Sequence, residues 1–174
     1  IWMESESRNE YTGVEFKPDP KVFRFGARSI SQGGWYNLWQ GYQVLPKKGC
    51  WDKIKHHLRE VWCGGDEQVY EYLLNWLADM FQYPHRQGGI CLVLNSEQGA
   101  GKGIIIDLLL LPILGVHGLT TSRGDDIIGR FNHAVGLCVF LCMNEAFWAE
   151  NKTNLGVLKT LISDPTLRVE QKFM

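Results

Sequence analysis

GICLVLNSEQGAGKG, residues 89–103, contains the strongest structural signal in this 174-residue chain. Its first part, Gly89–Leu94, is a short continuous apolar run, which is typical of a buried strand in a parallel sheet. The glycine-rich loop that follows leads into Ile104–Leu111, which is apolar all round and predicts a helix buried under a sheet. A strand, a glycine-rich loop and a helix in this order predict an α/β fold.

The loop has the composition of a phosphate-binding turn. Gly99 and Gly101 allow backbone dihedrals that other residues resist, so successive N–H groups can turn toward an anion. The following helix adds its positive end, and Lys102 is placed to reach the β- and γ-phosphates of a nucleotide. Two positions depart from the usual G-x-x-x-x-G-K-[ST] motif: Ser96 replaces the first glycine, and Gly103 replaces the hydroxyl residue that binds Mg²⁺. The alternative is an ordinary glycine-rich turn between a strand and a helix.

A second strand is predicted over Val135–Met143, where the chain is again fully apolar and ends in the polar pair Asn144 and Glu145. Such a strand end has the form of a Walker B motif. Glu145 is the candidate base that polarises the attacking water. Asn144 stands where an Asp is usual, so it offers no negative charge to Mg²⁺. The alternative for Glu145 is a helix-capping or surface acid.

Basic residues lie near the end of the chain. A helix is predicted over Thr153–Ile162, followed by a turn and an alternating β segment, Leu167–Phe173. Arg168 and Lys172 on this segment can hold a nucleic-acid backbone by charge attraction. An exposed hairpin of mixed charge is the alternative, because Glu170 lies between the two basic residues.

The chain upstream of residue 89 divides into an arm and a helical hairpin. Residues 1–48 are rich in polar, glycine and aromatic residues and predict a mostly extended arm. Its aromatic residues favour packing anchors over base-stacking platforms; they are Trp35, Tyr36, Trp39 and Tyr42. Helical spacing of apolar residues predicts helices over Trp51–Cys63 and Asp66–Gln82, with Asp66 as N-cap and Pro84 after the second helix.

Composition excludes several classes of protein. The chain has 18 Lys and Arg against 19 Asp and Glu, 45% hydrophobic residues and 21% charged residues, which excludes disorder and a strongly basic binder. The longest apolar stretch, Ile104–Leu114, is too short to span a bilayer. The five cysteines form no CxxC pair and predict buried free thiols of a reducing cytosol, and the adjacent His56 and His57 do not supply a zinc site. The chain does not begin with Met, so we expect it to be a fragment.

Four stretches, taken in order, resemble a known family: LVLNSEQGAGKG, GRFN, CVFLCMNEAFWA and LKTLISDPTLRVEQKF. Together they resemble the helicase portion of phage and prophage primase-helicases, a superfamily 3 group similar to the AAA+ ATPases. Two upstream stretches, YNLWQGY and YEYLLNWLADMFQYP, extend the resemblance back to about Trp35. The resemblance implies an α/β P-loop NTPase (AAA+-like) three-layer core, incomplete at the C-terminus. We expect residues 1–50 to be an N-terminal arm or linker, 51–85 a helical hairpin subdomain and 86–174 the partial P-loop ATPase core.

The resemblance also implies an activity, an ATP-dependent DNA helicase that moves along single-stranded DNA during phage-type replication. The parent protein would act in the host cytoplasm, away from membranes, as a ring (a hexamer by resemblance) joined to a primase or polymerase domain. ATP would be held by Ser96, Gln98, Gly99, Ala100, Gly101, Lys102 and Gly103. Lys102 and Glu145 would be catalytic, and Asn144 and Glu145 would hold Mg²⁺ through water. DNA would contact Lys159, Arg168 and Lys172.

Two other interpretations stay open. The departures at Ser96, Gly103 and Asn144 each remove a usual phosphate or metal contact, which favours a catalytically weak nucleotide-binding or assembly module of a replication protein. A small-molecule kinase is the third interpretation, but no Arg-rich lid is visible in the sequence. In addition, superfamily 3 enzymes carry a sensor Asn and an arginine finger after the region covered here. We therefore expect the fragment alone to show little turnover of ATP.

Overall fold

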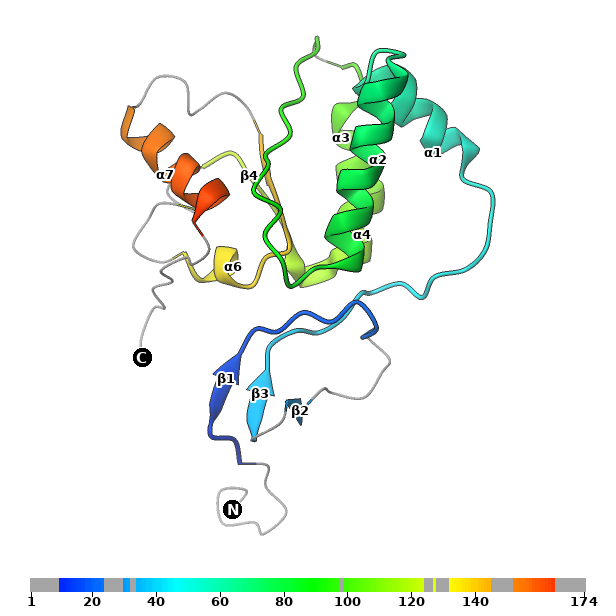
Figure 1. Cartoon of the computed structure of the whole chain (residues 1–174). Coiled ribbons are helices and arrows are strands. Elements are labelled where there is room, and N and C mark those ends of the chain that lie inside the picture. Colours follow the sequence, from blue (N-terminus) through cyan, green and yellow to red (C-terminus); the bar gives the residue numbers. More distant parts are fainter. Residues whose placement is uncertain are drawn as a thin grey trace.

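The computed structural model describes residues 10–23, 30–31, 34–97, 99–123, 127, 132–144 and 152–164. This part of the chain forms a small N-terminal sheet, a helical hairpin and a second small sheet between helices (Figure 1).

The N-terminal arm contains a three-stranded sheet of order β1-β3-β2, built from β1 (Gly13–Glu15), β2 (Ile30–Ser31) and β3 (Trp35–Asn37). Strand β3 runs parallel to β1 and antiparallel to β2. The aromatic residues that follow β3 are the anchors of the arm, because Trp39 and Tyr42 are 3% and 5% exposed. Their role as packing anchors is confirmed. Tyr36 packs edge-on against Tyr11, whereas Trp35 stays 41% exposed.

The helical hairpin is confirmed. Helix α1 (Asp52–His57) continues into a π-helical turn, η2 (Leu58–Trp62), and α2 spans Glu67–Gln82. The carboxylate of Asp66 caps α2 by accepting hydrogen bonds from the N–H groups of Gln68 and Val69, at 2.9 and 3.1 Å. The predicted apolar stripe of α2 is wrong at its start, since Val69 and Tyr72 are each 48% exposed.

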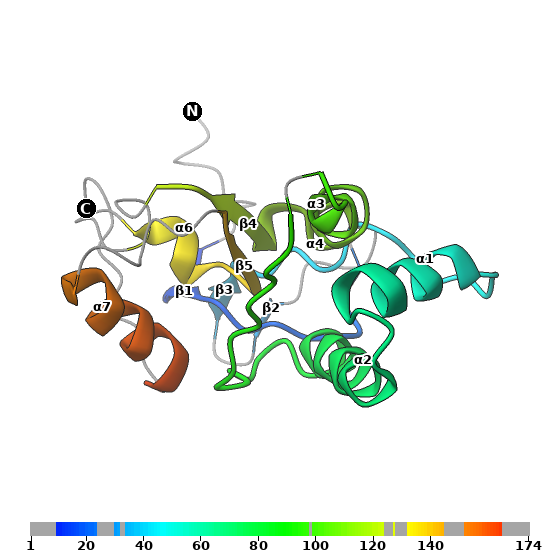
Figure 2. The ribbon, with the colours of Figure 1, turned by 90° about the horizontal axis from the view of Figure 1, so that it is seen from above.

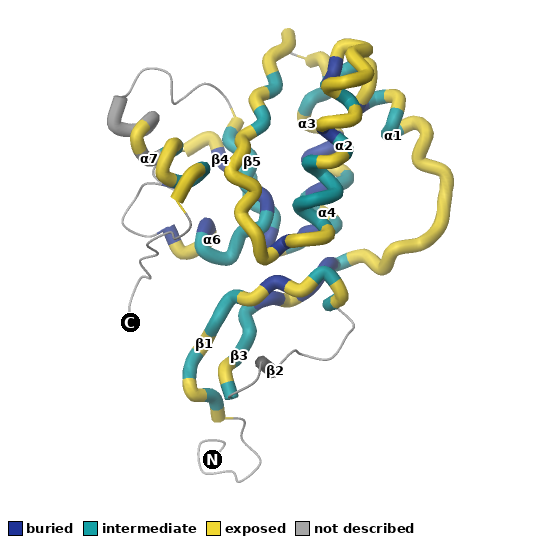
Figure 3. Tube along the Cα trace, viewed as in Figure 1, coloured by how far each residue is buried: buried dark blue, intermediate teal, exposed yellow. Residues whose placement is uncertain are grey.

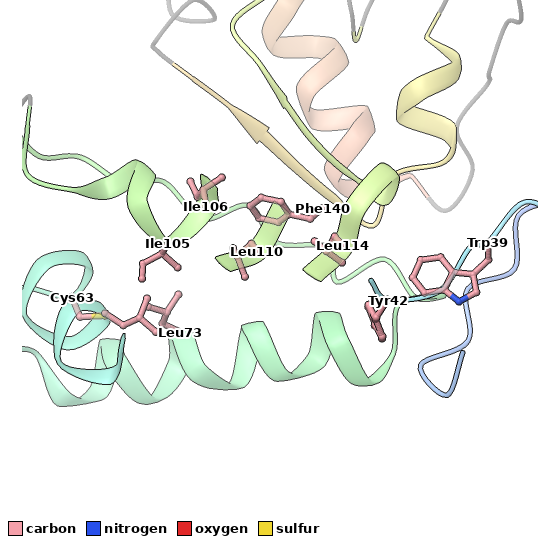
Figure 4. Packing of buried hydrophobic residues seen from close by; sticks show 10 residues of the cluster. Trp39, Tyr42, Cys63, Leu73, Ile105, Ile106, Leu110, Leu114 and Phe140 are labelled. Carbon is pink, nitrogen blue, oxygen red and sulfur yellow. The ribbon is translucent and has the colours of Figure 1, made fainter. Parts of the chain in front are cut away.

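A continuous helical run follows the glycine-rich loop. It consists of α3 (Lys102–Ile105), the π-helical turn η3 (Ile106–Leu110) and α4 (Leu111–Leu114), with right-handed helical dihedrals at both junctions. The 3-10 turn η4 (Gly115–His117) then leads to the second sheet. The expectation of burial all round is wrong, because Ile104 and Leu108 are 48% and 72% exposed. One side of the run packs against α2 (Figure 4).

The second sheet contains β4 (Gly118–Thr121) and β5 (Phe140–Met143), which pair in parallel. Side chains of β5 alternate between two hydrophobic clusters. Phe140 and Cys142 pack in the cluster of the helical run 102–114 and α2. Leu141 and Met143 pack in a smaller cluster that includes residues of α6 (His133–Gly136) and α7 (Lys152–Ser163). The sheet therefore lies between two layers of helices (Figure 2).

The long strand predicted over Val135–Met143 is only half right. Residues His133–Gly136 form α6, and the ladder with the neighbouring strand begins at Val139, whose N–H donates to the carbonyl of His117 at 2.8 Å. Burial of Val135 in the smaller cluster explains its apolar character without a strand. Strand β4 was not predicted, and the predicted helix of residues 153–162 is confirmed as α7.

The buried strand predicted over Gly89–Leu94 is wrong. This segment is extended and runs beside β5 (Figures 1 and 2), but within the described chain the backbone of residues 88–95 makes no hydrogen bond to another backbone group. Ile90 and Val93 are 51% and 86% exposed. A strand requires a neighbour that completes its hydrogen-bond ladder, and none of the described strands provides one here.

The cysteines are free, as predicted, but their burial differs from the expectation. Cys63 is buried and Cys91 is exposed, because Cys91 lies on the unpaired extended segment. Burial raises the pKa of Cys138 to about 12 and also raises the pKa of Cys63. These thiols are therefore protonated and unreactive at neutral pH.

Candidate functional site

The glycine-rich loop lies at the exposed start of the helical run 102–114 (Figure 3). Gly99 and Gly101 have φ values of +84° and +86°, in the left-handed region that favours glycine. The N–H of Ala100 donates to the carbonyl of Glu97 at 3.5 Å, and the N–H of Ile104 donates to the carbonyl of Gly101 at 3.3 Å. The loop is therefore a tight turn that ends as the N-cap of a helix.

The ammonium group of Lys102 closes this turn. Its Nζ atom donates to the backbone carbonyl of Ser96 at 2.7 Å and to that of Glu97 at 3.4 Å. The ammonium group is thus held by these two backbone carbonyls, and no carboxylate among the described residues forms an ion pair with Lys102. An anion that enters the loop can compete for the same ammonium group.

Backbone N–H groups of the loop are a second feature that can bind an anion, beside the ammonium group of Lys102. The N–H groups of Gly99, Gly101, Lys102 and Gly103 have no hydrogen-bond partner in the described part of the chain. The first N–H groups of a helix lack an intrahelical acceptor, and they carry the positive end of the helix dipole. Gln98, which the sequence also assigned to this site, lies outside the described residues. The arrangement can bind a phosphate-sized anion.

A carboxylate lies close to Gly103, where the usual motif has a hydroxyl residue. Gly103 is followed one helical turn later by Asp107, and a Cβ atom built on Gly103 would lie 3.3 Å from Oδ2 of Asp107. The charge of Asp107 also acts on Cys142, near the end of β5. Burial raises the pKa of the Cys142 thiol, and the negative charge of Asp107 raises it further. Cys142 in turn donates to Oδ1 of Asn144 at 3.5 Å.

Asn144 lies directly after β5, where its N–H donates to the carbonyl of Thr121 at 2.9 Å. The charge of Asp107 thus acts on Cys142, and Cys142 contacts Asn144 at the carboxyl end of β5. Glu145, the predicted catalytic base, lies outside the described residues. The predicted placement of a carboxylate at this strand end stays a prediction.

Of the predicted DNA-binding residues, the structure describes one, Lys159. Lys159 is exposed on α7, in the helix layer on the opposite side of the sheet from the run 102–114. Arg168 and Lys172 lie outside the described residues. Of the three, the structure therefore places Lys159 alone, and at a site separate from the loop.

One contact of the loop was missed by sequence reasoning. The Nε2 atom of His57, at the end of α1, lies 3.0 Å from the carbonyl oxygen of Gly101. The two residues are 44 positions apart, so no local pattern could have indicated the contact.

Other kinds of site receive no support from the described residues. No group of three or more His, Cys, Asp or Glu side chains among them could hold a metal ion. The longest helix described is α2, with 16 residues, and no helix in the described ranges combines the length and apolarity needed to cross a membrane.

Comparison with known proteins gives two similarities. Residues 94–174 match a family model described as a family of unknown function (DUF5906), and this match contains the loop, both strands of the second sheet and α7. The chain is also 32% identical over 135 residues to a DNA primase-polymerase of Nitratiruptor phage NrS-1, and the aligned region makes up 76% of the chain. It is thus a distant homologue of a phage DNA primase-polymerase. No solved structure matches the chain.

The chain spans 18% of the length of this phage relative. The matched region is therefore a minor part of that phage protein.

Proposed function

We propose that this chain is the nucleotide-binding core of an ATP-dependent DNA helicase domain, of AAA+-like P-loop type, in a phage-type replication protein. The observation that carries the proposal is the loop 96–103, in which two left-handed glycines turn the backbone around the ammonium group of Lys102. A loop of this kind before a helix is a phosphate-binding device in nucleotide hydrolases.

Binding of ATP would exchange the internal partners of Lys102 for those of the nucleotide. The ammonium group would leave the carbonyls of Ser96 and Glu97 and pair with the β- and γ-phosphates. The N–H groups of Gly99, Gly101, Lys102 and Gly103 would donate to the same phosphates. Phosphate oxygens carry negative charge, whereas the carbonyl oxygens of Ser96 and Glu97 are neutral dipoles, so the exchange adds an ion pair to the hydrogen bonds of the ammonium group.

A magnesium ion bound with the nucleotide fits the residues around Gly103. Magnesium prefers oxygen ligands, and its usual protein partners in such sites are carboxylates together with the phosphates. Oδ2 of Asp107 lies 3.3 Å from the point where a Cβ atom at position 103 would stand. The amide oxygen of Asn144 accepts a hydrogen bond from Cys142 at the end of β5. Asp107 and Asn144 would hold the ion, which neutralises charge on the transferred phosphoryl group.

Glu145 would accept the proton of the attacking water as it approaches the γ-phosphate. Its position directly after Asn144 would bring it to the carboxyl end of β5, near Cys142, on which the charge of Asp107 acts.

A role on DNA is supported by the phage relative, whose name is that of a DNA primase-polymerase, and movement along DNA is our proposal. We propose single-stranded DNA as the substrate track, with Lys159, Arg168 and Lys172 as contacts, and a ring of identical chains beside a primase-polymerase domain. The exposure of Lys159 is compatible with contact to a phosphate backbone.

The proposal is tested by ATP binding and by single-stranded-DNA-stimulated ATP hydrolysis in the full-length protein that contains this chain. Lys102→Ala is expected to abolish both, and Glu145→Gln is expected to abolish hydrolysis while binding persists. Lys21→Ala, which changes an exposed lysine of the N-terminal arm, is the matched control. Equal hydrolysis by the wild type and both site variants would refute the proposal.

A second candidate function is a nucleotide-binding assembly module without hydrolysis. The absence of a hydroxyl at Gly103 and of a charge at Asn144 favours it. In that case the wild type binds ATP through Lys102, and Glu145→Gln changes nothing because no hydrolysis occurs.

A further inference from the structure

The imidazole ring of His57 lies against the backbone of the phosphate-binding loop. Its Nε2 atom is 3.0 Å from the carbonyl oxygen of Gly101, and His57 is half-buried. A Cβ atom built on Gly101 would lie 3.0 Å from Cε1 and 3.6 Å from Nε2 of this ring. The helical hairpin therefore touches the loop at the residue that precedes Lys102.

The chemistry of this contact fixes the direction of the hydrogen bond. A backbone carbonyl can only accept, so Nε2 of His57 must carry the proton and donate it. The same carbonyl accepts from the N–H of Ile104 at 3.3 Å, which directs it along the helix that begins here. Two donors thus hold the carbonyl of Gly101 on the helix side of the loop.

This restraint determines where a phosphate-binding donor points. The peptide bond between Gly101 and Lys102 is trans. In a trans peptide the C=O and the next N–H point in opposite directions. Holding the carbonyl of Gly101 toward the helix and His57 therefore directs the N–H of Lys102 away from the helix, toward the open side of the loop. That N–H has no other partner within the described residues.

We propose that His57 is a positioning residue of the nucleotide site, which orders the Gly101–Lys102 peptide so that its N–H is ready to bind phosphate. The inference rests on the proposed function, because it assumes that the loop binds a nucleotide. It adds the helical hairpin to the site: α1 contributes a side chain that orients the loop without touching the ligand. Without the restraint, the peptide plane would have to be ordered again at each binding event, which weakens binding.

Three variants in the full chain test the proposal with Mg-ATP as the probe. His57→Phe keeps an aromatic ring and removes the donor. His57→Gln keeps an N–H donor at the same number of bonds from the backbone. His56→Ala changes the exposed neighbour and is the matched control. We expect His57→Phe to raise the Kd for Mg-ATP about three- to tenfold, which corresponds to one ordinary hydrogen bond, whereas His57→Gln and His56→Ala stay near the wild-type value.

The outcomes separate this inference from the proposed function. If the wild type binds Mg-ATP, Lys102→Ala does not, and His57→Phe binds as the wild type does, the role of His57 is refuted while the proposed function stands. If the wild type shows no binding, both are refuted. A merely structural role would weaken binding equally in His57→Phe and His57→Gln, so lack of rescue by glutamine also overturns the inference. Thermal unfolding without ligand identifies any variant that does not fold.

Discussion

His117, directly before β4, connects the N-terminal arm to Leu137, which lies between α6 and β5, so its replacement by phenylalanine tests how these parts of the fold are held together. The side chain is 1% exposed. Its Nε2 atom accepts a hydrogen bond from the N–H of Gln40 at 2.9 Å, and its Nδ1 atom donates to the carbonyl of Leu137 at 2.8 Å. The ring packs against Trp39 and Phe16, with centroid distances of 4.4 and 5.3 Å. Because the N–H of Gln40 can only donate, the ring must be neutral with its proton on Nδ1.

The expected cost follows from these contacts. His117→Phe keeps an aromatic ring against Trp39 and Phe16 but leaves the N–H of Gln40 and the carbonyl of Leu137 without partners. An unsatisfied buried group costs about 1–3 kcal/mol, so we expect the free energy of unfolding at pH 7.5 to fall by about 3 kcal/mol. For a chain of this size that corresponds to a fall of roughly 10 °C in the melting temperature.

The pH dependence provides a second measurement on the same residue. Burial lowers the pKa of His117 below its ordinary value of 6.5, so the unfolded chain takes up a proton at a higher pH than the folded chain does. The stabilisation from a neutral His117 is complete above pH 6.5. Below that pH it is lost by up to about 1.4 kcal/mol per pH unit, until the pH reaches the pKa of the folded state. His117→Phe has no such group, so the stability difference between the two proteins should shrink as the pH falls from 6.5.

Urea unfolding of both proteins at pH 7.5, 6.5 and 5.5 measures the two effects together. His133→Phe, at an exposed position on α6, is the matched control and should have nearly the stability of the wild type at pH 7.5. Equal stability of the wild type and His117→Phe at pH 7.5, or a difference that does not change between pH 6.5 and 5.5, would refute this account of the buried histidine.

Three further predictions concern the loop, the hairpin and the core. Gly101→Ala places a Cβ atom on a residue whose backbone φ is +86° and brings that atom against the ring of His57. The substitution should lower the free energy of unfolding by about 1–2 kcal/mol, measured by thermal unfolding. It should also weaken the binding of Mg-ATP, measured by titration. Asp66→Ala removes two capping hydrogen bonds from α2 and should cost about 1 kcal/mol in urea unfolding, and an unchanged midpoint would contradict the cap. Leu114→Ala, at 0% exposure, should cost about 3–5 kcal/mol, whereas Leu108→Ala, at 72% exposure, should cost less than about 0.5 kcal/mol; similar costs would contradict the one-sided packing of the helical run.

Elements with complete local signals were predicted well. The hairpin has apolar residues at helical spacing, a capping Asp66 and a stopping Pro84, and each of these acts within a few residues along the chain. The loop 96–103 is equally local, because its shape depends on the left-handed dihedrals of Gly99 and Gly101. Interactions between residues close together in the sequence were sufficient to predict the helices of the hairpin and the turn of the loop.

Strands were predicted poorly because they depend on partners far along the chain. Gly89–Leu94 has the composition of a buried strand, yet within the described residues it has no ladder partner and remains exposed. Strand β4 has an unremarkable sequence, Gly-Leu-Thr-Thr, and forms because β5 lies beside it in register. Apolar character alone did not separate α6 from β5, since Val135 is buried in a helix and Phe140 in a strand.

Gly103 illustrates how three-dimensional contacts change the meaning of a departure from a motif. By sequence, a glycine at this position is the loss of a hydroxyl ligand. In the structure, residues four apart on a helix share one face, and the carboxylate of Asp107 reaches to within 3.3 Å of the point where a Cβ at position 103 would lie. A serine or threonine there would require the carboxylate of Asp107 to shift by a few tenths of an ångström, so a side chain at 103 and the carboxylate of 107 are close neighbours. The glycine therefore leaves room beside the carboxylate of Asp107, the residue that we propose as a magnesium ligand, and under that proposal the departure is compatible with ATP chemistry at this loop.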